Sequence, residues 1–508
     1  MSTEKGNSFN YQFLILAIAA ICYSMFCITL IDADYIDFGD GNYLYISKRV
    51  YEGVILYKEI LSPQPPNHIM TGVFLMWLGN LFNNPLFTVR IFSLFIHIVT
   101  MIIVVLLANR ITRDRTVGMF AGIIYLMLPI GFWWSLGYQS ESLEIIFLLL
   151  CFYFILKDKQ WSYWVAGTCA TLAICTNMTA LPYLVLHMIY LVSAKRKRIL
   201  DFIIPAVMLA TIYGVVFSIY SGSAFWTNVW TNQVGTYPIN NLLSYAFGKI
   251  YSEGLDIFVQ DGVYILLCIC GILVYLEDTE ISDRIYVTWY ALFSMGSILF
   301  VTKGGTADYI FCIAEPMVAI FAGYFLYTLL IGTGTKTKGN KGKIFGILST
   351  RYFLVILLLI NIFVGSVSWM IKTYEKKTYE HPASEVMKVV DLINQHSGPR
   401  DMILAPPFYA FLTDRVIPAE ASESFIWYIK WYHSKLLDKI DPDVEWFSTT
   451  IKNSLHRRDV KIVLLNRNQY GHITPIARAV EESYRKTGQV IQSRHETLDV
   501  YLPRPMFP

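Results

Sequence analysis

Acidic and basic side chains gather in the stretch that follows the first long apolar run of the chain. Its four aspartates are Asp32, Asp34, Asp37 and Asp40, and its first basic residues are Lys48, Arg49 and Lys58. A carboxylate can take the proton from an attacking hydroxyl, and cations can stabilise the charge that grows on a leaving phosphate. The stretch therefore fits transfer of a group from a phosphate ester. The same charges would also suit a plain anchor that flanks a membrane helix.

A second acidic stretch reads Ser140-Glu141-Ser142-Leu143-Glu144 and stands where another apolar run begins. Glu141 is expected at the membrane surface. Glu144 lies one helical turn deeper, where an unpaired carboxylate is costly and is more often functional. A structural hydrogen bond between two helices is the alternative explanation for Glu144.

Two other polar stretches contain candidates for contact with a phosphate or a substrate. Lys303 opens a glycine-rich turn before Asp308 and Tyr309, and its side chain is long enough to reach a phosphate. A plain turn would explain this stretch equally well. His68 follows two prolines and is either a phosphate contact or a polar residue that caps a helix.

The composition is that of an integral membrane protein. Of the 508 residues, 55% are hydrophobic and 16% are charged, and the mean hydropathy is +0.45, whereas soluble domains carry about 25% charged residues. The net charge of +3 is small, and no basic stripe indicates a nucleic acid partner. The histidines lack metal-ligand spacing. No metal ion or other cofactor is therefore predicted, and the bare Asp32-Ala-Asp34 pattern is too weak to support a divalent ion.

Eleven apolar runs are predicted to be transmembrane helices. They cover residues 11–31, 86–108, 116–136, 143–157, 161–176, 178–193, 199–220, 258–276, 285–302, 309–331 and 350–371. The apolar run at 67–82 is short for a span and is predicted to be an interfacial or re-entrant helix. Before it, Tyr43, Ile46 and Val50 have the one-sided spacing of a helix that lies on a membrane surface.

This assignment places the loops richest in lysine and arginine on one side. These loops are 110–115, 157–159, 195–198 and 336–343. Basic loops favour the cytoplasm, so the N-terminus is predicted inside and the C-terminus outside a cell membrane that the chain crosses many times. The acidic and glycine-rich stretches, together with a long aromatic loop at 221–257, then share the extracytoplasmic side.

The composition changes after the last apolar run, which divides the chain into a membrane domain at 1–371 and an extracytoplasmic domain at 372–508. Predicted strands at 402–404, 460–465 and 498–502 alternate with predicted helices at 383–396 and 476–487. The predicted fold class is an α-helical polytopic membrane protein with about eleven transmembrane helices and a small C-terminal α/β domain.

The order of these features resembles the GT-C superfamily of multi-span glycosyltransferases. The similarity is greatest to the branch of the dolichyl-phosphate-mannose protein mannosyltransferases and the bacterial aminoarabinose lipid A transferases. The matching features are Asp40, a surface helix over 42–52, Gly53, the Tyr57-Lys58-Glu59 segment, the proline pair, the acidic motif at 140–143 and the segment 308–316. The chain departs from the pattern at Gly41, where the branch often has a second acidic residue, and at Asn177, where a lysine is usual.

The resemblance implies an inverting transfer of a hexosyl or pentosyl group from a polyprenyl or dolichyl phosphate on the extracytoplasmic face. The acceptor is a protein, a lipid or a polysaccharide. Asp40 is the implied general base, Asp37 is the reserve because of Gly41, and Glu141 is a further catalytic candidate. The candidates for binding the donor phosphate are Lys48, Arg49, Lys58, His68 and Lys303. The candidates for binding substrate are Tyr57, Glu59, Asp308 and Tyr309.

Two other functions fit parts of the sequence. A transporter or a flippase for lipid-linked sugars would place ionisable residues in the middle of its spans, whereas the span centres here hold almost none. A scaffold protein without catalytic activity would use the C-terminal domain to bind partners. Convergence of Asp40, Glu141 and Lys303 on one outward cavity would favour the transferase.

Overall fold

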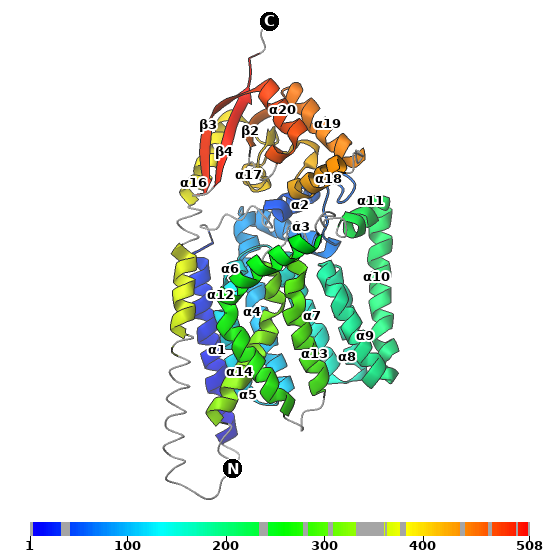
Figure 1. Ribbon diagram of the computed structural model, residues 1–508, viewed down its shortest axis with the longest axis vertical. Helices are drawn as coiled ribbons and strands as arrows, with labels where there is room; N and C mark the ends of the chain where they lie inside the picture. The colour runs from blue at the N-terminus through cyan, green and yellow to red at the C-terminus, as the bar shows by residue number, and fades with distance from the viewer. Residues whose placement is uncertain are drawn as a thin grey trace, which may run out of the picture.

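The computed structural model is a bundle of helices with a smaller α/β unit on one end (Figure 1). The end of the bundle that carries this unit is called the α/β end. The first helix, α1 (Glu4–Ile28), begins at the opposite end. The structure describes residues 4–31, 41–232, 242–277, 283–302, 308–331, 360, 363–375, 383–436, 442–465, 470–493 and 496–505.

Apolar helices make up the bundle. Besides α1 they are α4 (Pro85–Thr112), α5 (Arg115–Met127), α6 (Pro129–Trp134), α7 (Ser140–Lys157), α8 (Gln160–Ile174), α9 (Leu181–Ala194), α10 (Ile199–Ser221), α12 (Leu242–Glu277), α13 (Arg284–Met295) and α14 (Glu315–Ile331). Four of the described helices are long and apolar enough to cross a bilayer, over Tyr11–Ile28, Pro85–Thr112, Arg196–Ser221 and Phe247–Glu277. The chain is thus a mostly helical, multi-pass membrane protein, as its composition predicts.

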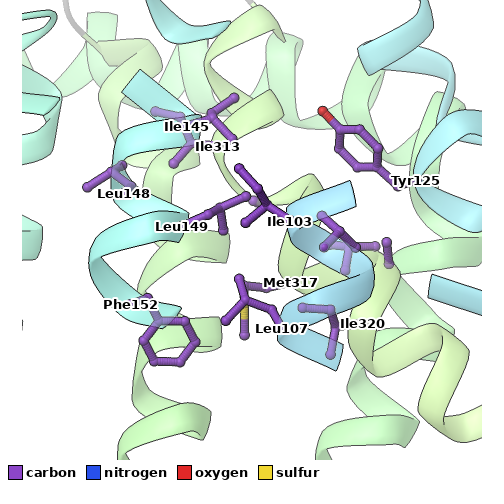
Figure 2. Packing of buried hydrophobic residues seen from close by; sticks show 14 of the residues in the cluster. Ile103, Leu107, Tyr125, Ile145, Leu148, Leu149, Phe152, Ile313, Met317 and Ile320 are labelled. Atoms are coloured by element: carbon purple, nitrogen blue, oxygen red, sulfur yellow. The ribbon is translucent and has the colours of Figure 1, made fainter. Parts of the chain in front are cut away.

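The centre of the bundle is filled by side chains from α4, α7 and α14 (Figure 2). Leu107, Leu149 and Met317 come from these three helices and are buried together. One turn further along α7, Phe152 stacks on Tyr290 of α13 with ring centroids 3.9 Å apart. Close packing of this kind makes the bundle a firm base for the polar groups at its α/β end.

Two predicted spans change direction or helix type near the α/β end. The span predicted at 116–136 is broken after Leu128, and Pro129 starts the separate helix α6 because proline has no N–H to continue α5. The span predicted at 285–302 ends as the 3-10 helix η5 (Gly296–Thr302). These breaks bring main-chain polar groups and short turns to this end of the bundle.

The loop predicted at 221–257 is largely helical, so that prediction is wrong. α11 (Ser223–Trp226) and the π-helix η4 (Thr227–Asn232) occupy its start, and α12 already begins at Leu242. Polar residues such as Lys249 and Glu253 obscured the first part of α12 in the sequence. They form an ion pair one helical turn apart, which supports the helix rather than a loop.

Two helices of the predicted first polar loop lie between the bundle and the α/β unit (Figure 1). α2 (Asn42–Tyr51) packs on α3 (Pro66–Leu81), and a Cβ added at Gly72 of α3 would lie only 2.1 Å from Ser47 Oγ of α2. One face of α3 exposes the apolar side chains Met70, Phe74, Trp77 and Leu81. Both helices are as predicted, and the exposed apolar stripe suits a helix at a membrane surface.

The α/β unit contains a four-stranded sheet in the order β1-β2-β4-β3. Its strands are β1 (Met402–Leu404), β2 (Val460–Leu465), β3 (Tyr484–Ser493) and β4 (Glu496–Pro503). β1 pairs with β2 in parallel, and the other two pairings are antiparallel. Three strands were predicted. β3 was not predicted, because its sequence is polar and its first residues were included in the helix predicted at 476–487. That helix, α20 (Thr474–Ser483), ends earlier, so the prediction is wrong over 484–487.

Helices and short turns cover the sheet. They are α16 (Ala383–His396), α17 (Pro407–Thr413), η7 (Pro418–Glu420), α18 (Ser424–Leu436), α19 (Pro442–His456), η8 (Tyr470–His472) and α20 (Thr474–Ser483). The buried residues of this unit form one hydrophobic cluster with those of α2 and α3, including Leu44, Ile46 and Leu75. The division predicted at residue 371 separates the two parts along the chain. In space, however, α2 and α3 pack with the α/β unit as well as with the bundle.

Candidate active site

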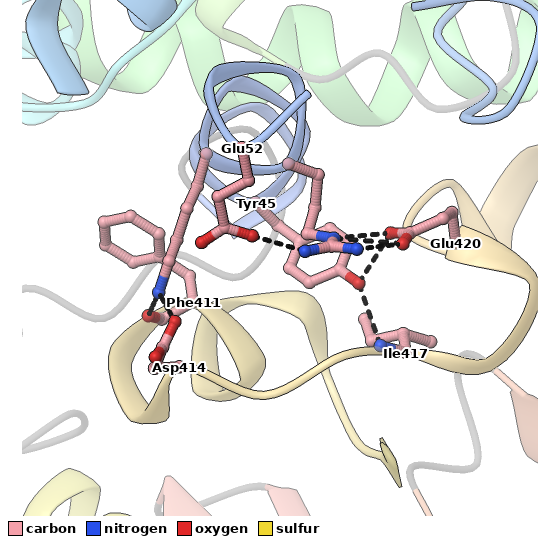
Figure 3. Close-up of polar contacts among 8 residues, drawn as sticks. Tyr45, Glu52, Phe411, Asp414, Ile417 and Glu420 are labelled. Atoms are coloured by element: carbon pink, nitrogen blue, oxygen red, sulfur yellow. Dashed lines mark hydrogen bonds and ion pairs between the residues drawn. The ribbon is translucent and has the colours of Figure 1, made fainter. Parts of the chain in front are cut away.

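Two ion pairs join the α/β unit to α2 (Figure 3). Arg49 Nη2 lies 2.6 Å from Glu420 Oε1, and Arg49 Nε donates to both oxygens of the same carboxylate at 3.0 and 3.1 Å. Lys48 Nζ lies 2.7 Å from Asp414 Oδ1. Tyr45 adds a hydroxyl that donates to Glu420 Oε2 at 2.9 Å. These contacts fix the orientation of α2 against the unit.

The same contacts shift the pKa values of Arg49 and Asp414. Burial alone would lower the pKa of Arg49, but the hydrogen bond and charge of Glu420 outweigh burial and raise that pKa above its usual value. Burial tends to raise the pKa of Asp414, but the hydrogen bond and charge of Lys48 hold it below its usual value. Lys48 and Arg49 are both paired with carboxylates, so their charges are already compensated within the protein.

A polar cluster surrounds the start of α7. Glu141 is 5% exposed, and its Oε1 accepts a hydrogen bond from Asn177 Nδ2 at 2.8 Å. Ser140 Oγ donates to Glu141 Oε2 at 3.1 Å. Asn177 stands just before η2 (Met178–Ala180) and accepts a hydrogen bond from Thr179 N at 3.2 Å. The residue that replaces the usual lysine thus contacts the predicted catalytic glutamate directly.

Tyr43 connects α2 and the α/β unit to this cluster. Its hydroxyl accepts a hydrogen bond from Gln64 Nε2 at 2.9 Å. Burial raises the pKa of Tyr43, and the charges of Glu141 and Glu423 raise it further, so both carboxylates lie near this hydroxyl. Glu423 belongs to the α/β unit, is 5% exposed, and accepts a hydrogen bond from Asn42 Nδ2 at 3.2 Å. Sequence reasoning missed Glu423, because nothing in the local pattern distinguishes it from other acidic residues.

The 3-10 helix η6 (Asp308–Ile313) adds two of the predicted substrate residues. Trp134 Nε1 donates to Asp308 Oδ1 at 3.3 Å, and Gln260 Nε2 donates to Asp308 Oδ2 at 3.3 Å. The ring of Tyr309 meets Trp134 edge-on with centroids 5.4 Å apart. The two carboxylates near Tyr43 also act electrostatically on the hydroxyl of Tyr309. The structure therefore brings Tyr309 to the predicted catalytic glutamate.

The Tyr57-Lys58-Glu59 segment reaches the cluster only through Tyr57. The hydroxyl of Tyr57 donates to the main-chain oxygen of Gln64 at 2.8 Å, and the side chain of Gln64 in turn donates to Tyr43. Lys58 and Glu59 are exposed on the turn that follows. Tyr57 is thus part of the support for the site, whereas Lys58 and Glu59 are exposed next to it in the chain.

His68 is fully buried at the start of α3. It stacks on Tyr138 with ring centroids 4.2 Å apart and meets Tyr43 edge-on at 4.7 Å. Burial lowers the pKa of His68 to about 3, so the imidazole carries no charge at neutral pH. An uncharged, enclosed ring offers no positive charge to a phosphate, which favours a structural role for His68 at the start of α3.

Asp37, Asp40 and Lys303 lie outside the described residues, so their predicted roles are neither confirmed nor contradicted. Asn42 and Tyr43, which follow Asp40 closely in the chain, are part of the polar cluster described above. Among the residues that the structure describes, no three histidine, cysteine, aspartate or glutamate side chains lie close enough together to hold a metal ion.

Two buried carboxylates deeper in the bundle were not predicted. Glu315 is 1% exposed and accepts a hydrogen bond from the main-chain N–H of Gly131 at 2.6 Å. The break at Pro129 leaves the first N–H groups of α6 without helical partners, so Glu315 satisfies one of them. Asp261 is completely buried and interacts electrostatically with Glu315. Both stand in predicted spans, where an ionised carboxylate is costly.

The polar cluster at the α/β end therefore combines groups from five parts of the chain. They are the hydroxyls of Tyr43 and Tyr309, the carboxylates of Glu141 and Glu423, and the amide of Asn177. Carboxylates accept protons or hydroxyl hydrogen bonds, and the other groups donate hydrogen bonds to oxygen atoms. Such a set can orient a hydroxyl for attack and hold a polar group that departs.

A multi-pass helical bundle with a polar cluster under a small α/β unit is the architecture of a membrane protein that does chemistry at one face. A family model for dolichyl-phosphate-mannose-protein mannosyltransferases matches residues 65–221. That match includes Glu141 and Asn177 but neither α2 nor the α/β unit. No curated protein sequence matches the chain.

Solved structures share the fold over nearly the whole chain. ArnT from Cupriavidus metallidurans, bound to undecaprenyl phosphate, has a TM-score of 0.58 and 13% identity, covering 96% of this chain and 98% of its own. The oligosaccharyltransferase AglB from Archaeoglobus fulgidus, in complex with an inhibitory peptide and a dolichol-phosphate, has a TM-score of 0.52 and 11% identity, covering 93% and 72%. The resemblance to the GT-C superfamily of membrane glycosyltransferases, and to its mannosyltransferase and ArnT branch, is thereby confirmed.

Proposed function

We propose that this protein is a glycosyltransferase that takes a hexosyl or pentosyl group from a polyprenyl-phosphate carrier and transfers it to an acceptor hydroxyl. The observation that carries this proposal is the cluster of Glu141, Asn177, Tyr43 and Glu423 at the α/β end, in which Tyr43 follows the aspartate-rich stretch closely in the chain. The shared fold supports it, because the ArnT and AglB structures were solved with undecaprenyl phosphate and a dolichol-phosphate.

In the proposed reaction the carboxylate of Asp40 takes the proton of the acceptor hydroxyl, with Asp37 as the reserve. The acceptor oxygen forms a bond to the anomeric carbon of the sugar from the face opposite the carrier, which inverts that centre. The bond between the anomeric carbon and the phosphate oxygen breaks, and its electron pair leaves with the polyprenyl phosphate. Lys58 and Lys303 are the cations proposed to stabilise that phosphate.

Glu141 is proposed to act beside the base. Its negative charge is held by Asn177 and Ser140 and lies near the hydroxyls of Tyr43 and Tyr309. A fixed carboxylate at this point can accept a hydrogen bond from a sugar or acceptor hydroxyl and so orient it for attack. Tyr309 and Asp308 are proposed to line the same substrate space.

The proposed orientation has about eleven spans, a cytoplasmic N-terminus and an extracytoplasmic α/β unit. A single cysteine in place of Lys388 of α16, whose side chain is 65% exposed, should react with a membrane-impermeant maleimide added to intact cells. A cysteine in place of Lys197, in the basic turn η3 (Arg196–Arg198), should react only after the membrane is permeabilised. The opposite labelling pattern would reverse the orientation and move the site to the cytoplasm.

The activity itself can be tested with purified protein and a panel of polyprenyl-phosphate sugars. We expect release of free polyprenyl phosphate from at least one sugar, and no release from the matching polyprenyl diphosphates, whose headgroup carries a further phosphate. The same preparation in liposomes serves as the control for transport. Movement of a labelled lipid-linked sugar between leaflets, with no turnover of any donor, would overturn the transferase proposal.

A further inference from the structure

The loop that precedes α18 presents two acidic side chains to the same helix. Glu420 forms an ion pair with Arg49, near the C-terminal end of α2. Glu423 accepts a hydrogen bond from Asn42, the first residue of α2. Both contacts join residues of the α/β unit to residues more than 370 positions earlier in the chain. The two acids differ in which end of α2 they hold.

The conformation of this loop is unusual. Ala419 and Glu420 both have positive φ values, of 58° and 48°, although neither is glycine. A non-glycine residue in this left-handed conformation is strained and persists only when its surroundings enforce it. The hydroxyl of Tyr470 anchors the loop by donating to Ala421 O at 2.6 Å. Local backbone strain at Ala419 and Glu420 thus accompanies the loop conformation in which Glu420 and Glu423 contact α2.

Glu423 contacts the N-terminal end of α2, which the aspartate-rich stretch precedes in the chain. The N-terminal end of α2 has no side-chain cap, since Gly41 stands at the N-cap position. A carboxylate is favoured near a helix N-terminus, and this one is almost fully buried beside Asn42. The chain that enters α2 at this point is the aspartate-rich stretch, in which Asp40 is separated from Asn42 by one glycine.

We propose that Glu423 is a positioning residue of the active site, through which the α/β unit holds the N-terminal end of α2, and with it Tyr43, in the polar cluster around Glu141. This inference rests on the proposed function for its effect on catalysis. Glu420 and Arg49, by contrast, dock the unit at the middle and end of α2. The two acids of one loop thus separate positioning from docking.

The test compares matched variants at the two acids. Glu423→Ala and Asn42→Ala should each lower kcat by about 10- to 100-fold, because small displacements of a catalytic group have effects of this size. The KM for the donor should change by less than about threefold. The double variant should have the same kcat as either single variant, because both substitutions remove the same hydrogen bond. Glu423→Gln should recover most of the activity, since an amide oxygen accepts the same hydrogen bond.

Glu420→Ala is the control, since it removes an acid from the same loop without touching Asn42. It should lower the melting temperature at least as much as Glu423→Ala but reduce kcat far less. Equal losses of kcat in Glu420→Ala and Glu423→Ala would overturn the proposal in favour of docking alone. A Glu423→Gln protein as slow as Glu423→Ala would overturn it in favour of a role for the charge itself.

Hydrogen exchange provides a readout that needs no sugar donor. The amides of residues 41–45 should exchange faster in Glu423→Ala than in Glu420→Ala, because only the former frees the start of α2. Unchanged exchange would contradict the positioning role even in an active enzyme. If the wild-type protein turned over no donor, the proposed function would fail, and the exchange comparison would still decide whether Glu423 holds α2.

Discussion

Replacing Asp40 by asparagine is expected to reduce sugar transfer by about 10²- to 10⁴-fold, the range in which general acid–base catalysis contributes to rate. Asparagine has nearly the same shape but cannot take the proton from the acceptor hydroxyl. The loss should therefore appear in kcat, while the affinity for the polyprenyl-phosphate donor stays close to that of the wild-type protein. Initial rates at saturating donor and acceptor, measured with equal amounts of folded protein, give the comparison.

Asp37→Asn is the matched control, because it removes a carboxylate from the same stretch three residues earlier. We expect this variant to keep its rate within about tenfold of the wild-type rate, which is less than the loss of a general base. If Asp37→Asn were inactive and Asp40→Asn active, the role of base would pass to Asp37. If both variants kept near-normal turnover, neither aspartate would be the base, and the proposed mechanism would be wrong.

Replacing Glu141 by glutamine is expected to have the second largest effect, a loss of about 100-fold in kcat, comparable to the loss of one preorganised electrostatic partner. The amide oxygen can still accept from Asn177 Nδ2, which lies 2.8 Å from Glu141 Oε1. The variant should therefore fold normally and lack only the negative charge near Tyr43 and Tyr309. Measurement of kcat and donor KM across a range of pH values separates this effect from a change in binding.

Glu144→Gln is the control for Glu141, since it makes the same chemical change one turn deeper in α7. Glu144 Oε1 accepts a hydrogen bond from Thr179 Oγ1 at 2.7 Å, which an amide oxygen can also accept. We expect this variant to keep its activity within about threefold, in line with the modest net contribution of one hydrogen bond between neutral groups. Similar losses in both glutamine variants would mean that the two glutamates serve the packing of α7 and not the reaction.

Local patterns in the sequence predicted the elements that hold the site. The proline pair and the short apolar run predicted the helix that became α3 (Pro66–Leu81), and the spacing of Tyr43, Ile46 and Val50 predicted α2. Apolar side chains have to be buried or placed against lipid wherever they stand, so their spacing along the chain reports the type of element and the exposed face. The same reasoning singled out Glu144, because an unpaired carboxylate one turn inside an apolar run is costly, whereas Glu141 was singled out by the resemblance of the stretch 140–143 to an acidic motif.

The partners of charged groups were not predictable in this way. Lys48 and Arg49 read as phosphate ligands from their place beside four aspartates, but the fold brings Asp414 and Glu420 to them from the far end of the chain. His68 was predicted to be either a phosphate contact or a helix cap, yet the rings of Tyr43 and Tyr138 pack against it. In each case the role depends on what lies across a contact between distant segments.

By itself, the sequence determined that the chain is a multi-pass helical protein and which residues form the helices α2 and α3. It also identified the acidic stretches that are candidates for the site. These are consequences of hydrophobicity and helical periodicity, which act over a few neighbouring residues. Only the tertiary structure decided that Glu423 meets Asn42, that Asn177 holds Glu141, and that α2 is shared between the bundle and the α/β unit. Hydrogen bonds and ion pairs require specific distances between groups that the linear order of residues leaves open.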